Sequence, residues 1–346
     1  MNHFAPIPKL TKGDKVAIVS PSFAAPGKFP HVYELGLRRL REEFELEPIE
    51  YPTTRQLGAS TEERARDLIA AFTDPEIKAV IATIGGNDQV TYVKNLPIEP
   101  FKNNPKAFFG FSDNSHFENF LWLNGVPSYY GGSIMTQFAM QKRMDAYTQE
   151  YLRYALFDGG VKEIKPCDRY NDEGLDWGDP DTLDKERNYE PSEGWHWDGS
   201  VDGEGVIWGG CVESVDEMLR HNVPIPKNEE FNRIVLCLET SEEIPSADYV
   251  FRVLRAFGER GLLARVQAVL MGRPKAWEFS NQKSTQEKES YRKEQRNTVL
   301  RVVRAYNPTI PIVQNMEFGH TDPQIPLPYG KTIRINSSEK KIIVEF

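Results

Sequence analysis

The feature that most constrains the fold is an alternation of short apolar runs with amphipathic segments. Continuous runs rich in Val, Ile and Phe are typical of buried strands, and three of them are KVAIVS (15–20), KAVIATI (78–84) and AFFGFS (107–112). Between the first two, residues 31–44 place apolar side chains at helical spacing. Ser60 and Glu63 then form a capping-box pattern ahead of a second helix. This alternation predicts an α/β fold whose mostly parallel sheet is covered on both faces.

The second half of the chain repeats this alternation of apolar runs and amphipathic segments after a long interruption. Apolar runs at 205–210, 233–239 and 265–272 predict further strands, and the C-terminus predicts a hairpin. Two helices are also expected, one over 249–257 that Gly258 ends as a C-cap and a polar one over 283–306. A chain of 346 residues exceeds one comfortable hydrophobic core. We therefore expect two domains, 1–160 and 199–346.

Residues 161–198 form the interruption between the two predicted domains. Asp and Glu are dense there and apolar runs disappear, as in a linker. The segment nevertheless holds Trp177, Trp195 and Trp197, half of the six tryptophans of the chain. Solvated linkers seldom carry so many large rings. We interpret the segment as a long excursion that packs on the protein, because connections of this length are usually functional or disordered.

Composition excludes several classes of function. With 51 acidic against 42 basic residues, the net charge of −9 argues against a nucleic acid polymer as the main partner. No segment has the roughly 20 apolar residues of a membrane helix, and no secretion signal is recognisable, so we expect a cytoplasmic protein without a membrane partner. The three cysteines form no CxxC pair and the six histidines show no metal-ligand spacing. Reduced thiols and no metal are expected.

One serine and two glycines follow predicted strands. Gly110-Phe111-Ser112-Asp113 is half of a GxSxG nucleophile elbow, because position 114 is Asn. The alternative is that Ser112 caps the next helix. Gly85 and Gly86 similarly end a strand, where backbone N–H groups can approach an anion or an oxyanion. The alternative is a tight turn, and no Lys follows as it would in a P-loop.

An acid and a histidine in the second half complete a possible catalytic set. Glu239 ends a very apolar run, where a carboxylate needs a partner or a task, whereas Glu242 and Glu243 are interpreted as a solvated turn. His320 lies in a loop bounded by Gly and Pro, and a lone loop histidine often has only a structural role. Ser112, Glu239 and His320 would supply nucleophile, acid and base, in that chain order. Composition does not show that they meet.

The order of five blocks resembles the serine LD-carboxypeptidase family, which includes the microcin C self-immunity peptidases. The blocks are LTKGDKVAIVSPS (10–22), RARDLIAAFTDPEIKAVIATIGGND (64–88), FFGFSDNS (108–115), IVLCLETSEE (234–243) and FGHTDPQIPLPYG (318–330). The resemblance implies a flavodoxin-like N-terminal domain, a smaller C-terminal α/β domain and an active site at their junction. It also implies a homodimer and no cofactor.

Residue by residue, the resemblance implies a role for each candidate. Ser112 would be the nucleophile, Glu239 the acid and His320 the base. The backbone N–H groups of Gly86 and Asp113 would form the oxyanion hole. Substrate contacts are expected at two further residues, Gly85 and Trp177.

Three functions follow as hypotheses. The first is a serine amidase that cleaves the amide between a C-terminal aspartyl or similar residue and a modified nucleotide, as in microcin C self-immunity. In that branch an aromatic residue of the excursion stacks on the base, and Trp177 is the expected one. The second is an LD-carboxypeptidase that trims cytoplasmic muropeptides. The third is a catalytically silent module that binds a peptide or nucleotide.

Overall fold

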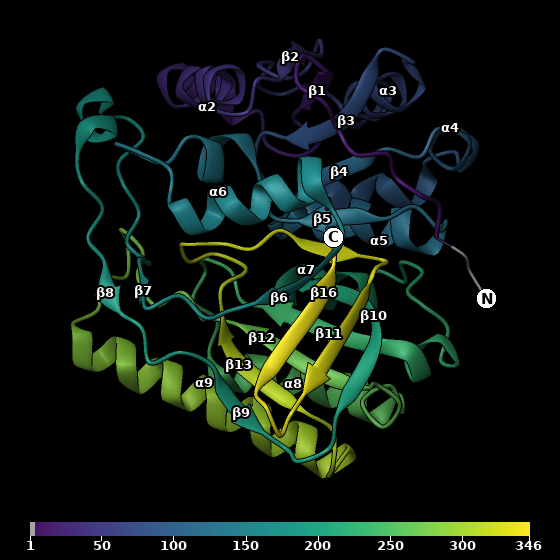
Figure 1. The fold of residues 1–346 in the computed structure, drawn as a ribbon, viewed down its shortest axis with the longest axis vertical. Helices are drawn as coiled ribbons and strands as arrows, with labels where there is room; N and C mark the ends of the chain where they lie inside the picture. Colours follow the sequence, from purple (N-terminus) through teal and green to yellow (C-terminus); the bar gives the residue numbers. More distant parts are fainter. Residues whose placement is uncertain (1–3) are drawn as a thin grey trace.

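The computed structural model describes residues 4–346 and contains two β-sheets, one above the other in Figure 1. The first sheet has the strand order β14-β5-β4-β3-β1-β2. Its strands are β1 (Lys15–Val19), β2 (Glu47–Glu50), β3 (Ile77–Ala82), β4 (Ala107–Gly110), β5 (Ser128–Tyr130) and β14 (Leu327–Tyr329). The first five run parallel, and their order 2-1-3-4-5 is that of the flavodoxin-like fold. The expected N-terminal α/β architecture is confirmed.

Helices cover both faces of the first sheet, as the sequence predicted. They are α1 (Ala25–Lys28), α2 (Pro30–Glu42), α3 (Thr61–Thr73), α4 (Glu99–Asn103), α5 (Ser115–Leu123) and α6 (Ala146–Arg153). The capping box is confirmed, because the Ser60 side chain accepts from the Glu63 N–H and the Glu63 carboxylate accepts from the Ser60 N–H. No helix within residues 4–346 is long and apolar enough to cross a membrane.

The second sheet has the order β6-β16-β15-β10-β11-β12-β13-β9. Its strands are β6 (Val161–Ile164), β9 (His196–Asp198), β10 (Gly203–Cys211), β11 (Ile234–Glu239), β12 (Ala268–Gly272), β13 (Ile312–Met316), β15 (Thr332–Asn336) and β16 (Lys341–Glu345). β10 to β13 run parallel, and the predicted hairpin is β15–β16. Its helices are α7 (Val212–Arg220), α8 (Ala247–Glu259) and α9 (Thr285–Tyr306).

The excursion over 161–198 is packed on the rest of the protein. It contributes β6 and β9 to the two edges of the second sheet. Between them β7 (Arg169–Tyr170) and β8 (Glu190–Pro191) pair with each other beside α9 (Figure 1). Conversely, β14 leaves the second half of the chain and pairs with β5 of the first sheet. The second half of the chain therefore supplies one strand to the first sheet.

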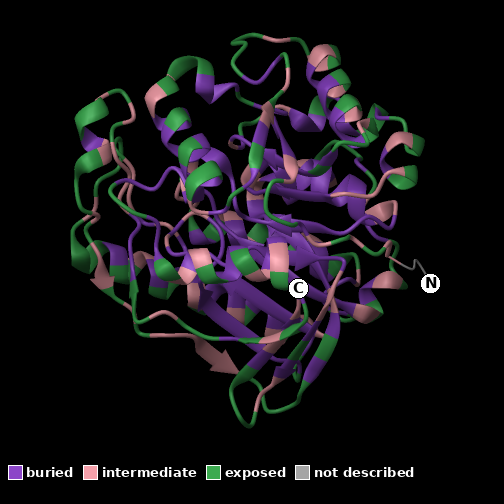
Figure 2. Cartoon of the chain, turned by 45° about the horizontal axis from the view of Figure 1, so that its top comes forward, coloured by how far each residue is buried: buried purple, intermediate pink, exposed green. Residues whose placement is uncertain are grey.

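Buried residues form a continuous core across both sheets, as the purple interior of Figure 2 shows. Two tryptophans lie where the halves meet. The indole N–H of Trp122 on α5 donates to the Ile207 carbonyl at 3.1 Å, and that of Trp208 on β10 donates to the Asn119 side chain at 3.2 Å. Because both donors are satisfied inside the core, the junction is packed like a domain interior.

One expected helix end is wrong. Gly258 does not cap α8, which continues to Glu259 and is followed by Gly261 at φ +72°. A Cβ at Gly258 would lie 2.2 Å from the Tyr306 ring of α9. The glycine therefore permits close packing of α8 on α9, a long-range reason that local spacing does not reveal.

Candidate active site

The site lies where the carboxyl ends of strands from both sheets meet. In the first sheet the loops after β1, β3 and β4 come together beside the β1/β3 switch point, which is where ligands bind in folds of this order. The β4 loop carries Ser112 and the β3 loop carries Gly85 and Gly86. From the second sheet come Glu239, at the end of β11, and His320, in the loop between β13 and β14.

Ser112 stands on a sharp turn between β4 and α5. Its φ is +62°, a left-handed conformation that is rare for residues other than glycine and typical of a nucleophile elbow. The side chain does not cap α5, because no side-chain cap bond is present at that helix start. Asn114, the residue that departs from the GxSxG pattern, connects the loop after β4 to the loop after β3 by hydrogen bonds. Asn114 Nδ2 donates to the Ile84 carbonyl at 3.2 Å, and Gln89 Nε2 donates to Asn114 Oδ1 at 2.7 Å.

Glu239 and His320 form a buried pair. Nδ1 of His320 lies 2.7 Å from Oε2 of Glu239, whose side chain is fully buried. Gly319 makes this approach possible, since a Cβ there would lie 2.3 Å from the same oxygen. The imidazole also meets the ring of Phe111 edge-on, with centroids 5.0 Å apart. The histidine is therefore oriented by an acid on one side and by the residue before Ser112 on the other.

Tyr130 connects the acid to the serine, and sequence reasoning missed it. Its hydroxyl accepts the Ser112 N–H at 3.2 Å and donates to Oε1 of Glu239 at 2.5 Å. Burial and the neighbouring Glu239 raise the pKa of this phenol, so it keeps its proton and remains a donor. Both oxygens of Glu239 thus have partners.

Glu242 corrects one sequence interpretation. Its side chain is 53% exposed, as a solvated turn requires, but its Oε2 lies 3.1 Å from Nε2 of His320. Burial alone would raise the pKa of the Glu242 carboxyl, yet the charge of His320 lowers it to about 2. Burial alone would likewise lower the pKa of His320, but Glu239 and Glu242 raise it to about 10. The imidazole therefore lies between two carboxylates that both favour its protonated form.

The expected oxyanion loop is shaped by the Asp113 side chain. Oδ2 of this carboxylate accepts from the Ser22 hydroxyl at 2.6 Å and from the N–H groups of Asp88 and Gln89 at 3.1 Å. Burial raises the pKa of Asp113, against the lowering effects of His116 and these donors. The Gly86 N–H makes no backbone hydrogen bond within residues 4–346.

The two glycines of this loop are placed differently. A Cβ on Gly85 would lie 2.9 Å from Cβ of Ser112 and 3.2 Å from the Asp113 nitrogen. A Cβ on Gly86 would instead lie 2.0 Å from the Ser22 hydroxyl oxygen. The loop therefore needs glycine at both positions, and Gly85 lies directly against the serine turn.

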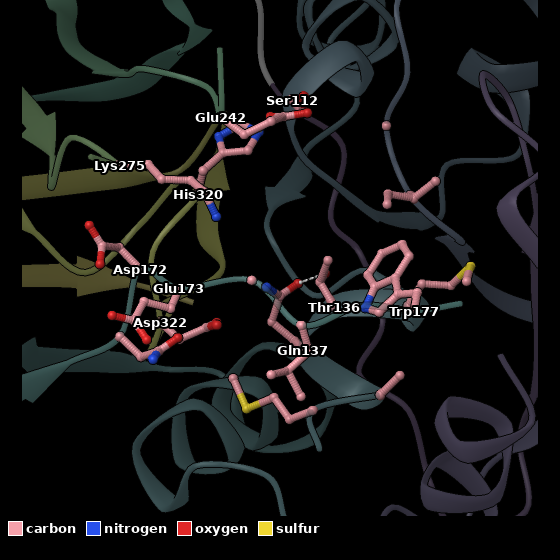
Figure 3. A pocket seen from close by; sticks show the side chains of 18 of the residues that line it. Ser112, Thr136, Gln137, Asp172, Glu173, Trp177, Glu242, Lys275, His320 and Asp322 are labelled. Carbon is pink, nitrogen blue, oxygen red and sulfur yellow. Dashed lines mark hydrogen bonds and ion pairs between the residues drawn. The ribbon is translucent and has the colours of Figure 1, made fainter. Parts of the chain in front are cut away.

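A cavity of about 390 Å³ joins these parts. Figure 3 shows Ser112, Glu242 and His320 gathered at one end of it and Trp177 across from them. Trp177 also meets Phe29 edge-on at 5.6 Å. The other two tryptophans pin the excursion instead. The Trp195 indole donates to Glu317 at 2.6 Å, and Trp197 belongs to β9.

Two clusters in residues 4–346 have the donor types of a metal site, Cys211 with Glu239 and His320, and Asp113 with His116 and Glu217. In each cluster the acids and histidine already pair with protein groups. Glu239 pairs with His320 and Tyr130. His116 Nε2 lies 3.2 Å from Glu217, and Asp113 accepts three bonds. Neither cluster needs an ion to compensate its charges.

The charged wall of the cavity was also missed. Asp172, Glu173, Lys275, Glu278 and Asp322 all line it. They come from the excursion, from the segment between β12 and α9 and from the loop after His320. These segments follow no regular pattern, so the only available signal was their position near strand ends.

Comparison with known proteins places these observations in context. The profile of the LD-carboxypeptidase N-terminal domain matches residues 16–131, and that of the C-terminal domain matches 204–335. The putative carboxypeptidase YocD of Bacillus subtilis is 29% identical over 340 residues, which cover 95% of each chain. The crystal structure of an MccF-like protein from Streptococcus pneumoniae in complex with AMP has a TM-score of 0.84 at 26% identity, covering 96% of this chain and 99% of that one.

A second solved structure shares the fold alone. It is the microcin C7 self-immunity protein MccF in complex with aspartyl sulfamoyl adenosine, with a TM-score of 0.84 at 19% identity and 98% coverage of both chains.

Proposed function

This chain belongs to the LD-carboxypeptidase family of peptidases, and from that premise we propose that it is a serine amidase that cleaves the amide between an aspartyl or similar residue and a modified nucleotide. One observation carries the proposal: Ser112 and Trp177 line the same cavity from different segments. A flat indole face across the cavity from a nucleophile suits a substrate with an amide at one end and a base at the other, and base–aromatic stacking contributes about 1–3 kcal/mol.

The relatives support the nucleotide class of substrate. The Streptococcus pneumoniae protein was solved in complex with AMP and MccF in complex with aspartyl sulfamoyl adenosine. In this chain the excursion supplies Trp177 to the wall of the cavity that Ser112 also lines. The ring meets Phe29 edge-on at 5.6 Å, a contact that holds it at this side of the cavity.

The mechanism follows from the proposed roles. His320, oriented through Nδ1 by Glu239, takes the Ser112 proton on Nε2 while Oγ attacks the amide carbonyl. The N–H groups of Gly86 and Asp113 stabilise the oxyanion, and one such donor contributes about 2.7–4 kcal/mol. The imidazolium then protonates the leaving nitrogen. Water hydrolyses the acyl-enzyme by the same groups in reverse order.

A second candidate is removal of a terminal D-amino acid from a muropeptide, which the description of the two family domains favours. The cavity holds one feature in its support. Lys275 lines it and forms no hydrogen bond or ion pair with any group in residues 4–346. An unpaired ammonium in a cavity suits a terminal carboxylate as well as it suits a phosphate or sulfamate.

The test is hydrolysis of aspartyl sulfamoyl-adenosine and of a tetrapeptide muropeptide by the wild type, Ser112→Ala and Ser338→Ala, followed by mass spectrometry. Ser338 is exposed at the β15–β16 turn and serves as the matched control. We expect free aspartate from the wild type and Ser338→Ala, and none from Ser112→Ala. Cleavage of the muropeptide alone would favour the second candidate.

Labelling with a fluorophosphonate separates both activities from a silent binding module. Only an activated serine displaces fluoride from the probe. Folded wild-type protein that remains unlabelled at Ser112 by fluorophosphonates both with and without an ammonium group would exclude the serine mechanism.

A further inference from the structure

The Glu242 carboxylate pairs with Nε2 of His320, the nitrogen that the proposed catalysis requires. In the proposed mechanism Nε2 of His320 must face Ser112, yet this nitrogen lies 3.1 Å from Oε2 of Glu242. In residues 4–346 no hydrogen bond joins Ser112 to His320, although both line one cavity. The carboxylate belongs to the turn after β11 and is half exposed, so it can move without disturbing the core.

The charges on the cavity wall single out Glu242. Asp172 pairs with Lys288 and Arg292, and Asp322 pairs with Arg187. Glu173 lies 3.4 Å from the Lys288 ammonium. Glu278 accepts the Phe279 N–H and has no cationic partner within the described chain, whereas the one cationic partner of Glu242 there is His320. Glu242 is therefore the ionised carboxylate at the catalytic end whose partner has to change during the reaction.

The groups facing His320 explain its resting state. Glu239 and Glu242 flank the ring, the Cys211 thiol lies beside Glu239, and Lys275 lines the cavity nearby. Two carboxylates raise the pKa of the imidazole against the effect of burial. At neutral pH the ring consequently holds two protons and cannot accept a third from Ser112.

We propose that Glu242 is a specificity-determining residue that binds an ammonium group on the substrate residue whose carbonyl is attacked. The inference rests on the proposed serine mechanism and adds a substrate feature to it. An incoming ammonium competes with His320 for the carboxylate. Once Glu242 pairs with the substrate, one of the two charges that hold the second imidazole proton is neutralised.

The proton balance is simple. The Nε2 proton leaves His320 for solvent water, and the neutral ring then accepts the Ser112 proton as Oγ attacks. A substrate without an ammonium does not displace Glu242 from Nε2 of His320, so the imidazole stays protonated and cannot act as the base. Recognition and activation would thus be one event, which limits hydrolysis of peptides that lack a free amine at this position.

The test uses two fluorophosphonate probes that differ only at one amine. The first carries a primary ammonium three to four bonds from phosphorus, and in the second this amine is N-acetylated and therefore uncharged. Labelling rates of Ser112 are measured in the full-length wild type, Glu242→Gln and Glu243→Gln. Glu243 is the matched control, because it is the exposed neighbour and does not line the cavity.

We expect the wild type and Glu243→Gln to react about ten- to a hundredfold faster with the ammonium probe, the range for one charge-assisted hydrogen bond. In Glu242→Gln the ratio should fall to within about threefold, the size of an exposed charge effect. The acetylated probe should react at least as fast with Glu242→Gln as with the wild type, because Nε2 is no longer paired with a charge.

The outcomes separate the two proposals. Equal labelling of both probes in the wild type, or an unchanged ratio in Glu242→Gln, would overturn the role of Glu242 while leaving the serine mechanism intact. An equal decrease of the labelling rate with both probes in Glu242→Gln would mean that Glu242 only positions His320 and does not bind the ammonium. Absence of labelling with either probe in folded wild type would end both proposals.

Discussion

Tyr130 illustrates how one buried hydroxyl can organise a site. It accepts from the Ser112 N–H and donates to Glu239, which in turn contacts His320. The turn that carries the serine and the acid that orients the histidine are therefore held by the same atom. A carboxylate with both oxygens bonded keeps one orientation, so the phenol fixes the imidazole indirectly.

At this scale we predict that Tyr130→Phe lowers kcat about tenfold or more and raises KM little, because the change affects orientation of Glu239 rather than substrate contacts. The unpaired Oε1 of Glu239 should also reduce the free energy of unfolding by about 1–3 kcal/mol. Steady-state kinetics and urea unfolding measure the two effects.

Tyr129→Phe is the control, since Tyr129 lies on the same strand as Tyr130, whereas its hydroxyl accepts from Lys9 and has no bond to the site. Its kcat should stay at the wild-type value. An unchanged kcat in Tyr130→Phe as well would remove Tyr130 from the catalytic arrangement.

At the scale of elements, the wall of the cavity depends on how the excursion is attached to α9. Asp172 is fully buried and contacts the Lys288 ammonium at 2.9 Å and the Arg292 guanidinium. Lys288 also reaches Glu190 of β8 at 2.7 Å. In β7 the Tyr170 hydroxyl accepts from Arg292 at 2.6 Å, so both strands of the β7–β8 pair are anchored to α9. The segment that carries Trp177 extends between these anchors.

We predict that Asp172→Asn frees the excursion. Loss of the carboxylate leaves two buried cations undercompensated and should cost on the order of 3 kcal/mol. Trypsin should then cleave after Lys185 faster than in the wild type. Glu186→Gln is the control, because its ion pair with Arg143 is exposed and contributes less than about 1 kcal/mol. Unchanged cleavage in Asp172→Asn would show that other contacts hold the segment.

The elements also show where sequence reasoning succeeded and why it stopped. The strands of both sheets and the capping box of α3 could be predicted, because apolar runs and N-cap chemistry are local properties. The end of α8 could not be predicted, because the glycine at position 258 is required by close packing against the ring of Tyr306 in another helix. The excursion was recognised by its tryptophans, but its attachment to α9 depends on charges more than a hundred residues away.

The same distinction applies to the site. Ser112, Glu239 and His320 could be selected because each follows a strand or occupies a special loop, and the family resemblance gave their roles. Their roles remain predictions. Tyr130 and Glu242 lacked such signals, since a tyrosine in a strand and a glutamate in a turn are ordinary until the fold brings Tyr130 to Glu239 and Glu242 to His320.

For the whole molecule, the resting state of His320 links stability to pH. The pKa of this group is raised from 6.5 to about 10 in the folded protein, so the native state binds the extra proton between these values. Its contribution is complete below about pH 6.5 and is lost as pH rises towards 10. We predict that the free energy of unfolding falls by roughly 2–4 kcal/mol over this range, a figure discounted for the exposure of Glu242.

Urea unfolding of the wild type and His320→Gln at a series of pH values checks this slope. The variant should lack the His320 share of the decline, whereas exposed groups titrate alike in both proteins. Parallel curves for the two proteins would mean that His320 is not held as an imidazolium.

The return of β14 to the first sheet has a consequence for biosynthesis. Its partner β5 ends at Tyr130, but the strand itself begins only at Leu327, shortly after His320. Ser112, the proposed nucleophile, therefore leaves the ribosome long before β14 and His320 do. A nascent chain arrested before this point has an open sheet edge and lacks His320, so under the proposed mechanism the growing polypeptide needs protection from aggregation before it is able to hydrolyse a substrate.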